Sequence, residues 1–255
     1  MRTRRALQAV VAWIVPVLVL GLWEYASRVG LLSARVLPEP WAVIEAAWHL
    51  LRTGELWANL KVSAWRAFVG LAIGGGFGLG LGLIVGLSRS MELALDTSLQ
   101  MLRNIPPLAM IPLVILWFGI DEGAKLFLVA LGVFFPIYLN TVHGIRSVEP
   151  ALIEMARSYG LSGWKLYRDV ILPGAMPSIL VGLRYALGLM WVVLIVAETI
   201  SASSGIGYMT MNAREFLQTD VVLVGILLYA LLGKLADMAA RALERVCLRW
   251  HPSYQ

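Results

Sequence analysis

Long apolar blocks separated by short polar segments run through the whole chain of 255 residues. A membrane-spanning helix needs about 20 mostly apolar residues. Six blocks meet this requirement: 9–27, 67–87, 99–118, 124–143, 177–199 and 220–240. The pattern predicts an all-α, polytopic membrane protein with six transmembrane helices, and a single transmembrane domain over residues 1–255 accounts for the full length.

The third block differs from the others because Pro106, Pro107 and Pro112 interrupt it. A proline inside a helix removes a backbone hydrogen bond. Transmembrane helices tolerate this loss where neighbouring helices or water satisfy the freed carbonyl groups. We therefore expect a kinked or broken helix that lines a cavity.

The distribution of lysine and arginine predicts the orientation in the membrane, because cytoplasmic loops are enriched in these residues. With a cytoplasmic N-terminus, 13 of them lie inside and 7 outside, and Arg184 lies within the fifth block. The inner set is Arg2, Arg4, Arg5, Arg89, Arg103, Arg146, Arg157, Lys165, Arg168, Lys234, Arg241, Arg245 and Arg249. The outer set is Arg28, Arg35, Arg52, Lys61, Arg66, Lys125 and Arg214. Six spans then place both termini in the cytoplasm, and the first block, which shows no cleavage site, is expected to be a retained signal anchor.

A polar interruption between two apolar blocks, residues 149–173, has the pattern of a short helix–turn–helix. Pro150 suits the first turn of a helix, and Gly160 suits the left-handed conformation that ends one. Ser162 is expected to cap a second helix, and Pro173 is expected to end it. The apolar face of the first helix is formed by Leu152, Met155, Ala156 and Tyr159, and that of the second by Trp164, Tyr167 and Ile171.

Composition and net charge exclude several classes of protein. Hydrophobic residues make up 59% of the chain and charged residues 15%, whereas soluble domains carry about 25% charged residues. The net charge of +5 does not indicate a nucleic-acid-binding protein, because the basic residues are scattered at block ends instead of clustering on one face with aromatic residues.

Residues with catalytic or metal-binding chemistry do not form recognisable patterns. The single cysteine, Cys247, excludes an internal disulfide and a cysteine-based metal cluster. His49, His143 and His251 lack the spacing of zinc ligands. No Ser/His/Asp grouping indicates a nucleophilic site. We predict no catalytic and no metal-binding residues, which argues against a membrane-embedded enzyme.

The second apolar block contains a glycine at every fourth position, namely Gly70, Gly74, Gly78, Gly82 and Gly86. Residues four apart lie on one face of a helix, so these glycines predict a flat strip that allows close helix packing. A phosphate-binding loop is the alternative, but the chain contains no G-x-x-x-x-G-K-[ST] sequence. An ATP-driven function would therefore need ATP and Mg²⁺ on a partner chain.

Polar residues inside the apolar blocks are candidate functional residues, because charges in a bilayer are costly. Arg184 and Glu198 lie in the fifth block, about 21 Å apart along the helix. We expect Arg184 either to reach the inner headgroups or to line an anion path. Glu198 is expected to be a partnered structural or gating residue. Arg103 and Asn104, before the proline break, are the other candidates for a translocation path.

Three outer segments carry further expectations. Trp41, Ile44, Trp48 and Leu51 form one helical face that suits the membrane interface, with Glu45 and Arg52 away from that face. Asp121 and Glu122 are expected in a solvated turn. Residues 201–220 are expected to form a longer loop, either re-entrant or facing a partner.

The polar interruption resembles the signature loop of binding-protein-dependent ABC importer permeases. The matching positions are Glu154, Met155, Ala156, Gly160, Val170, Leu172 and Pro173. Met155 replaces an alanine of the family pattern and Val170 an isoleucine, and both keep the position apolar. In the family this loop is the cytoplasmic coupling helix that docks into an ATP-hydrolysing subunit.

The resemblance extends along almost the whole chain, including the stretches SLQMLRNIPPLAMIPLVILWFG and LRYALGLMWVVLIVAETISASSGIGYMT. It is to the nitrate/taurine/sulfonate branch and, within it, to aliphatic-sulfonate permeases. This implies a type I importer fold in a bacterial inner membrane, a homodimer, two cytoplasmic ATP-binding subunits and a periplasmic binding protein. ATP and Mg²⁺ would bind to the ATPase subunits, and this chain would bind no cofactor. Taurine, nitrate or another small anion remains open as the substrate, and a passive channel remains an alternative function.

Overall fold

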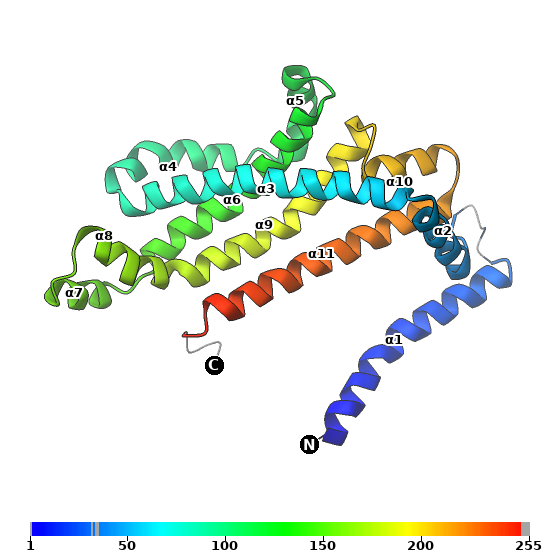
Figure 1. Cartoon of the computed structure of the whole chain (residues 1–255), viewed down its shortest axis with the longest axis horizontal. Coiled ribbons are helices and arrows are strands. Elements are labelled where there is room, and N and C mark those ends of the chain that lie inside the picture. Colours follow the sequence, from blue (N-terminus) through cyan, green and yellow to red (C-terminus); the bar gives the residue numbers. More distant parts are fainter. Residues whose placement is uncertain (1, 32, 34–35, 251–255) are drawn as a thin grey trace.

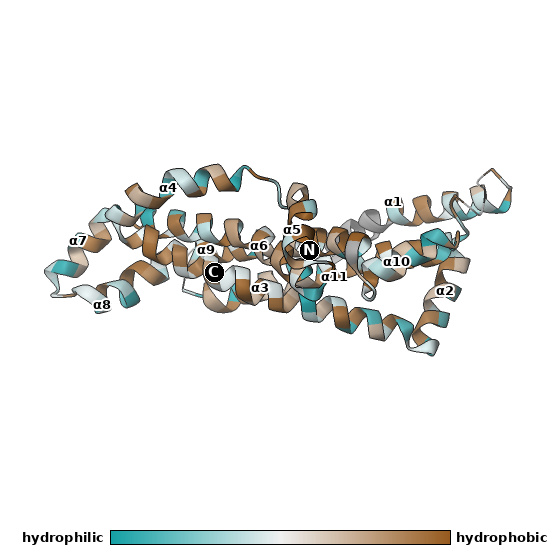
Figure 2. Ribbon diagram, turned by 90° about the horizontal axis from the view of Figure 1, so that it is seen from above, coloured by the Kyte–Doolittle hydropathy of each residue, from teal (hydrophilic) through white to brown (hydrophobic). Residues whose placement is uncertain are grey.

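The computed structural model describes residues 2–31, 33 and 36–250, and every regular element in this part of the chain is a helix (Figure 1). The body consists of four long helices in the packing order α3 (Glu55–Leu87), α6 (Glu122–Arg146), α9 (Leu172–Ser201) and α11 (Thr219–Cys247). At one end lie α2 (Pro40–Thr53) and α10 (Ile206–Glu215), and at the other α7 (Pro150–Ser158) and α8 (Gly163–Leu166) (Figures 1 and 2). We call these the α2/α10 end and the α7/α8 end. The predicted all-helical class is confirmed.

The backbones of α3 and α6 approach each other closely because the glycines of α3 face α6. The residues concerned are Gly70, Gly74, Gly78, Gly82 and Gly86. A Cβ atom on Gly78 would lie 2.6 Å from the carbonyl oxygen of Phe134, and one on Gly82 would lie 2.7 Å from Cβ of Thr141. A larger residue would push the helices apart, so only glycine permits this spacing. Gly76 lies on another face of α3, where an added Cβ atom would meet no atom within 4 Å.

Apolar side chains fill the space between the long helices. The central cluster includes Val129 and Val133 of α6 and Met190 and Leu194 of α9. A second cluster, which includes Ile206 of α10, joins α2, α3 and α11 at the α2/α10 end. Because burial of apolar surface drives packing, these clusters stabilise the bundle at its centre and at the α2/α10 end.

The predicted third span is broken, as its prolines indicate. The helix α4 (Arg89–Arg103) is followed by the short 3₁₀ helix η1 (Pro107–Met110) and by α5 (Ile111–Phe118), and the two halves are bent by 80°. Proline lacks an amide donor and also restricts the residue before it. The break at residues 104–106 therefore falls where the Pro106–Pro107 pair begins.

Among the described residues, four helical segments are long and apolar enough to cross a membrane, or five if the bent α4–α5 pair is one span. Three of them are α3, α6 and α11, and the fourth is the continuous segment Gly163–Ile200. Hydrophobic residues run along the length of these helices (Figure 2). The predicted first block, 9–27, lies in α1 (Arg2–Arg28), but the side chains of residues 1–13 lie outside the part that the structure describes.

Helix α1 precedes α2 in the chain and diverges from the body at the α2/α10 end (Figure 1). The buried side of α2 is formed by Val43, Ala46 and Leu50. The predicted apolar face, Trp41, Ile44, Trp48 and Leu51, points away from the body and is exposed. The prediction that Glu45 and Arg52 lie away from this face was wrong. Glu45 accepts a hydrogen bond from Nε1 of Trp41 at 2.7 Å, and the guanidinium of Arg52 lies 4.8 Å from the ring centroid of Trp48. Each charged residue follows its tryptophan by four positions and therefore shares its face.

The helix–turn–helix at the α7/α8 end follows the predicted pattern in its first half. Pro150 occupies the first turn of α7, and Gly160 has a φ of 82°. Ser162 precedes α8, although its side chain makes no capping hydrogen bond. The predicted end at Pro173 was wrong, because the π-helical turn η2 (Tyr167–Ile171) leads directly into α9. Proline is tolerated in the first turn of a helix, and Pro173 occupies that position in α9.

Candidate functional site

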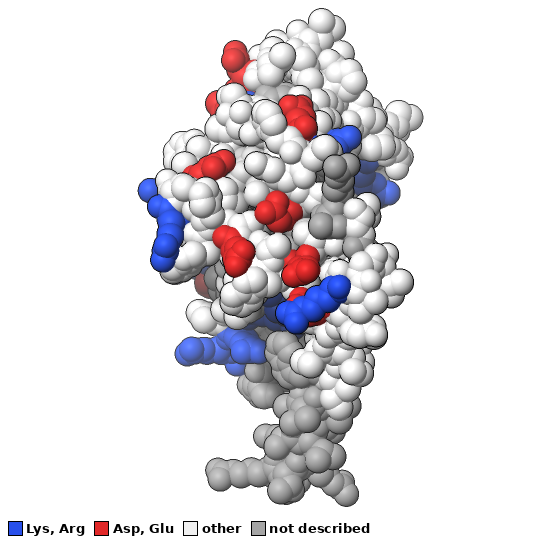
Figure 3. Space-filling model, turned by 90° about the vertical axis from the view of Figure 1, so that its right-hand side faces the viewer, with Lys and Arg blue, Asp and Glu red and all other residues white. Residues whose placement is uncertain are grey.

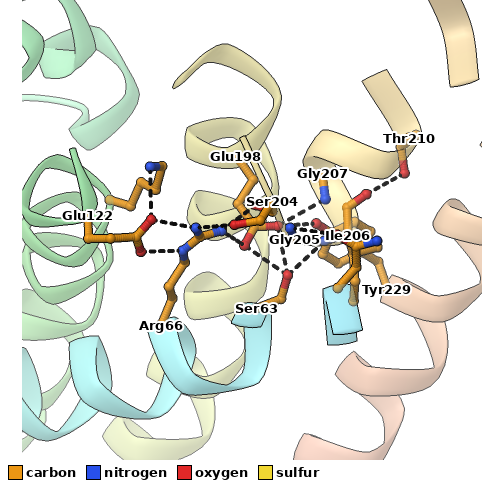
Figure 4. Close-up of polar contacts among 12 residues, drawn as sticks. Ser63, Arg66, Glu122, Glu198, Ser204, Gly205, Ile206, Gly207, Thr210 and Tyr229 are labelled. Atoms are coloured by element: carbon orange, nitrogen blue, oxygen red, sulfur yellow. Dashed lines mark hydrogen bonds and ion pairs between the residues drawn. The ribbon is translucent and has the colours of Figure 1, made fainter. Parts of the chain in front are cut away.

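A buried polar cluster near the α2/α10 end is organised around Arg66 (Figure 4). Its Nη1 donates to Oε1 of Glu198 at 2.8 Å and to the carbonyl oxygen of Ser204 at 2.6 Å. Its Nε donates to Oε2 of Glu122 at 2.6 Å. The guanidinium therefore connects α3 with α6, α9 and the segment before α10. Because hydrogen bonds between ionised groups are strong, these contacts orient the arginine in one geometry.

The carboxylate of Glu198 receives hydrogen bonds from several further elements. The hydroxyl of Ser63 donates to it at 2.8 Å and that of Tyr229 at 3.2 Å. The backbone N–H of Gly207, in the first turn of α10, donates at 2.9 Å. A carboxylate at a helix N-terminus satisfies unpaired amide groups and complements the positive end of the helix dipole. Glu198 thus ties α10 and α11 to α9.

The start of α10 fits closely against this cluster. The N–H of Gly205 donates to Oδ1 of Asn59 at 2.8 Å, and the N–H of Ile206 donates to Oγ of Ser63 at 2.8 Å. Gly205 has a φ of 110°, which favours glycine. A Cβ atom on Gly207 would lie 2.5 Å from Cβ of Glu198. Half of the predicted loop 201–220 is thus the helix α10, whose first turn is anchored to the body.

The charges of the cluster balance. Lys125, whose side chain is 2% exposed, lies 3.2 Å from Oε1 of Glu122, so two cations face the two carboxylates of Glu122 and Glu198. Asp121 and Glu122 are exposed, as expected for solvated residues. However, Glu122 is the first residue of α6 and not part of a turn, and its side chain, 56% exposed, pairs with the guanidinium of Arg66. The fully paired arrangement suits a structural tie, and among the described residues no group of three or more His, Cys, Asp or Glu could hold a metal ion.

The four polar residues predicted for a translocation path lie in three separate places. Arg103 and Asn104 are exposed at the bend after α4, where the Asn104 amide donates to the carbonyl oxygen of Gln100 at 3.1 Å. Arg184 lies on α9 and pairs with Asp237 of α11 at 2.8 Å. Glu198 belongs to the buried cluster. The structure thus does not bring these four together.

Exposed apolar side chains mark the helix–turn–helix at the α7/α8 end. Leu152, Met155, Tyr159 and Trp164 are 44%, 52%, 82% and 69% exposed. Ala156 is buried, as is Leu166 of α8. The predicted apolar face thus turns one small residue inward and leaves its large residues uncovered. An exposed apolar surface of this kind is typical of a protein–protein interface.

Acidic side chains gather on the face at the opposite end (Figure 3). A hollow of about 430 Å³ between α2, α10 and the start of α11 is lined by residues that include Glu45, Glu55 and Asp220. The α2/α10 end thus carries an acidic hollow beside the exposed apolar face of α2.

Several members of the buried cluster were missed by reasoning from the sequence. Arg66 and Lys125 were treated as ordinary charges of outer segments, and Ser63 and Tyr229 were not singled out. The available signal was the position of four charges, Arg66, Glu122, Lys125 and Glu198, at block ends on the same predicted side of the membrane. Balanced charges at such positions indicate ion pairs between helices.

Solved structures of ABC transporters share the fold of this chain. An amino acid ABC transporter crystallised with histidines matches with a TM-score of 0.58 and 19% identity, over 77% of this chain and 97% of that chain. The MetNI methionine ABC transporter in an inward-facing conformation matches with a TM-score of 0.56 and 19% identity, over 77% and 96% of the two chains. These likenesses concern the fold.

Residues 78–247 match the family model of the binding-protein-dependent transport system inner membrane component, and the chain belongs to this family. It is 65% identical to an aliphatic sulfonates transport permease protein of Escherichia coli (strain K12), over 98% of this chain and 95% of that protein. A protein of the same name from Bacillus subtilis (strain 168) is 46% identical, over 95% and 88%. A taurine transport system permease protein of Escherichia coli (strain K12) is 37% identical, over 92% and 88%. The expected membership in the permease family is confirmed.

Proposed function

We propose that this chain is the permease subunit of an ATP-driven importer that carries aliphatic sulfonates across the bacterial inner membrane by alternating access. The observation that carries the proposal is the 65% identity, over nearly the full length, to the aliphatic sulfonates permease of Escherichia coli. The Bacillus subtilis relative of the same name supports the same substrate class. As a transport permease, the chain has no catalytic residues of its own in this proposal.

The proposed topology has six spans with both termini in the cytoplasm. The four long apolar segments, the bent α4–α5 pair and α1 together make six. The excess of lysine and arginine on the predicted inner side supports this orientation. The α7/α8 end then lies in the cytoplasm and the α2/α10 end, with its acidic hollow, in the periplasm.

The proposed assembly is a homodimer with two cytoplasmic ATP-binding subunits and a periplasmic substrate-binding protein. Membership in a binding-protein-dependent transport family supports the substrate-binding protein as a partner. The absence of a phosphate-binding loop from the sequence supports the placement of ATP and Mg²⁺ on separate subunits. Apolar side chains such as Trp65, Phe77 and Leu116, which are 68%, 72% and 78% exposed, offer surface for lipid and for the second copy.

The helix–turn–helix is the proposed coupling segment, with Glu154, Met155, Ala156, Gly160, Val170, Leu172 and Pro173 at the positions that match the family pattern. Exposure of Tyr159 and Trp164 supports docking against another protein. Because η2 leads directly into α9, a displacement of the docked segment is transmitted to that helix without an intervening flexible loop. Closure of the ATPase subunits would therefore tilt α9 and open the path alternately to each side.

Taurine is the second candidate substrate, on the basis of the 37% identity to a taurine permease. The test is uptake of labelled alkanesulfonate, taurine and nitrate by the chain reconstituted with its ATPase and binding protein. We expect ATP-dependent uptake of the alkanesulfonate. Uptake of only nitrate would refute the sulfonate proposal, and uptake of only taurine, itself a sulfonate, would favour the second candidate. Uptake without ATP would indicate a passive channel.

A further inference from the structure

A hollow of about 660 Å³ opens between α9 and α11 and combines charged with apolar walls. Arg184 and Asp237 are the charged residues among those described around it. Val181, Tyr185 and Leu189 line it on α9 and are 39%, 66% and 43% exposed. They follow one another at helical spacing, so they form an apolar stripe beside the arginine.

The arginine at this hollow shares its carboxylate partner with a second arginine. Nε of Arg184 donates to Oδ1 of Asp237 at 2.8 Å, while Nε and Nη2 of Arg241 donate to Oδ2 at 2.9 and 2.7 Å. Two guanidinium groups thus share the carboxylate of Asp237, and Glu244 also faces Arg241. Within the described part of the chain, Nη1 and Nη2 of Arg184 have no hydrogen-bond partner, and 42% of the side chain is exposed.

A cation with unused donors inside a transmembrane helix is costly unless an anion accompanies it. The guanidinium has a planar array of N–H donors that matches the oxygens of an oxyanion in pairs. A sulfonate headgroup offers such oxygens. The apolar stripe beside it suits an alkyl chain, which gains free energy by leaving water.

We infer that this hollow is a substrate site in the translocation path, in which Nη1 and Nη2 of Arg184 bind the headgroup of an alkanesulfonate and Val181 and Leu189 contact its alkyl chain. The inference rests on the proposed function and deepens it by assigning the residues that contact the substrate. Arg184 lies 12 residues after Leu172, about 18 Å along α9, so the site lies nearer the α7/α8 end. A phospholipid headgroup has the same oxyanion chemistry, and the experiment distinguishes the two sources.

The experiment measures binding of labelled hexanesulfonate to the complex of the permease with its ATPase subunits, without the binding protein, in vesicles of phosphatidylcholine. We expect Arg184→Gln to raise the Kd roughly tenfold or more, because a hydrogen bond to a charged group is lost. Arg184→Lys should bind with intermediate affinity. Arg245→Gln removes the same charge from an exposed position of α11 outside the hollow, and its Kd should match that of the wild type.

Asp237→Asn separates substrate binding from a purely structural tie between α9 and α11. If Arg184 binds the headgroup, this variant should lower the Kd, because the anion no longer competes with a carboxylate. If the pair were only a structural tie, Asp237→Asn and Arg184→Gln would weaken the binding of hexanesulfonate equally, and that result would overturn the inference. In the wild type, affinity should rise a few-fold for each methylene from methanesulfonate to hexanesulfonate.

Vesicles with added anionic phospholipid test the lipid alternative. We expect hexanesulfonate to bind equally well in both kinds of vesicle, whereas suppression of its binding by the anionic lipid would identify a lipid site and overturn the inference. An unchanged Kd in Arg184→Gln would also overturn it. These failures differ from failure of the proposed function, in which the complete wild-type system with its binding protein would take up no alkanesulfonate.

Discussion

Arg66 and Glu198 are 132 residues apart in the sequence, yet Nη1 of Arg66 donates to Oε1 of Glu198 at 2.8 Å. Both side chains are almost fully buried, with 1% and 0% exposed. Two ions lose much hydration when they are buried as a pair, and the removal of one leaves the other without compensation. The pair is therefore a point at which α3 and α9 depend on each other.

Replacement of Arg66 by methionine should destabilise the protein by about 3–5 kcal/mol, because it leaves a buried carboxylate unpaired. Thermal unfolding of the purified chain in detergent measures the effect. Arg89→Met is the matched control, since 78% of the Arg89 side chain is exposed in its pair with Glu92 and an exposed pair contributes about 1 kcal/mol or less. Equal loss of stability in the two variants would contradict this account.

Gly78→Ala should destabilise the contact between α3 and α6, because its Cβ would lie 2.6 Å from the carbonyl oxygen of Phe134. Gly76→Ala is the control on the same helix, where nothing lies within 4 Å. Both substitutions raise helix propensity by about 1 kcal/mol, so the difference between their unfolding midpoints reports packing. We expect Gly78→Ala to unfold at the lower temperature, and a higher midpoint for it would refute the role of the glycine strip.

Gly160→Val should leave insertion into the membrane intact but abolish ATP-driven transport. Gly160 has a φ of 82°, and a β-branched residue in the left-handed region is strained by about 1–3 kcal/mol. Membrane fractionation and uptake assays measure the two effects separately. Gly160→Asn is the control, because asparagine tolerates this conformation. Normal uptake by the valine variant would count against a docked coupling segment.

Trp164→Ala should weaken the association with the ATPase subunits without loss of stability, because 69% of this side chain is exposed. Large aromatic residues at the centre of an interface typically lose more than 1 kcal/mol of binding free energy on truncation. Copurification of the ATPase with the tagged permease measures the association. Leu166→Ala, at a position 7% exposed, should instead lower the unfolding temperature. If Trp164→Ala retained the ATPase fully, the tryptophan would lie outside the interface.

The helices of the body were predictable because long apolar runs have few alternatives to a helix in a membrane. The repeat of glycines at every fourth position predicted a strip, and the structure places that strip against α6. The break before Pro107 was also predictable, since proline acts on its immediate neighbours. In each case the information lies within one element or a few adjacent residues.

The partners of the charged residues were not predictable in this way. Arg66 precedes the second apolar block by one residue and was assigned to an outer segment, whereas α3 begins as early as Glu55. Its contact with Glu198 depends on how α3 and α9 pack, which no local periodicity encodes. The continuity of α9 through Pro173 was missed for a related reason, because a proline can begin a helix as well as end one.

The glycine strip has a mechanical consequence for the proposed alternating access. Because the backbones of α3 and α6 are in contact over several successive turns, the two helices are expected to move as one rigid unit. We therefore expect the conformational change to be concentrated where such backbone contact is lacking. The two candidate places are the 80° bend between α4 and α5 and the interface between α9 and α11.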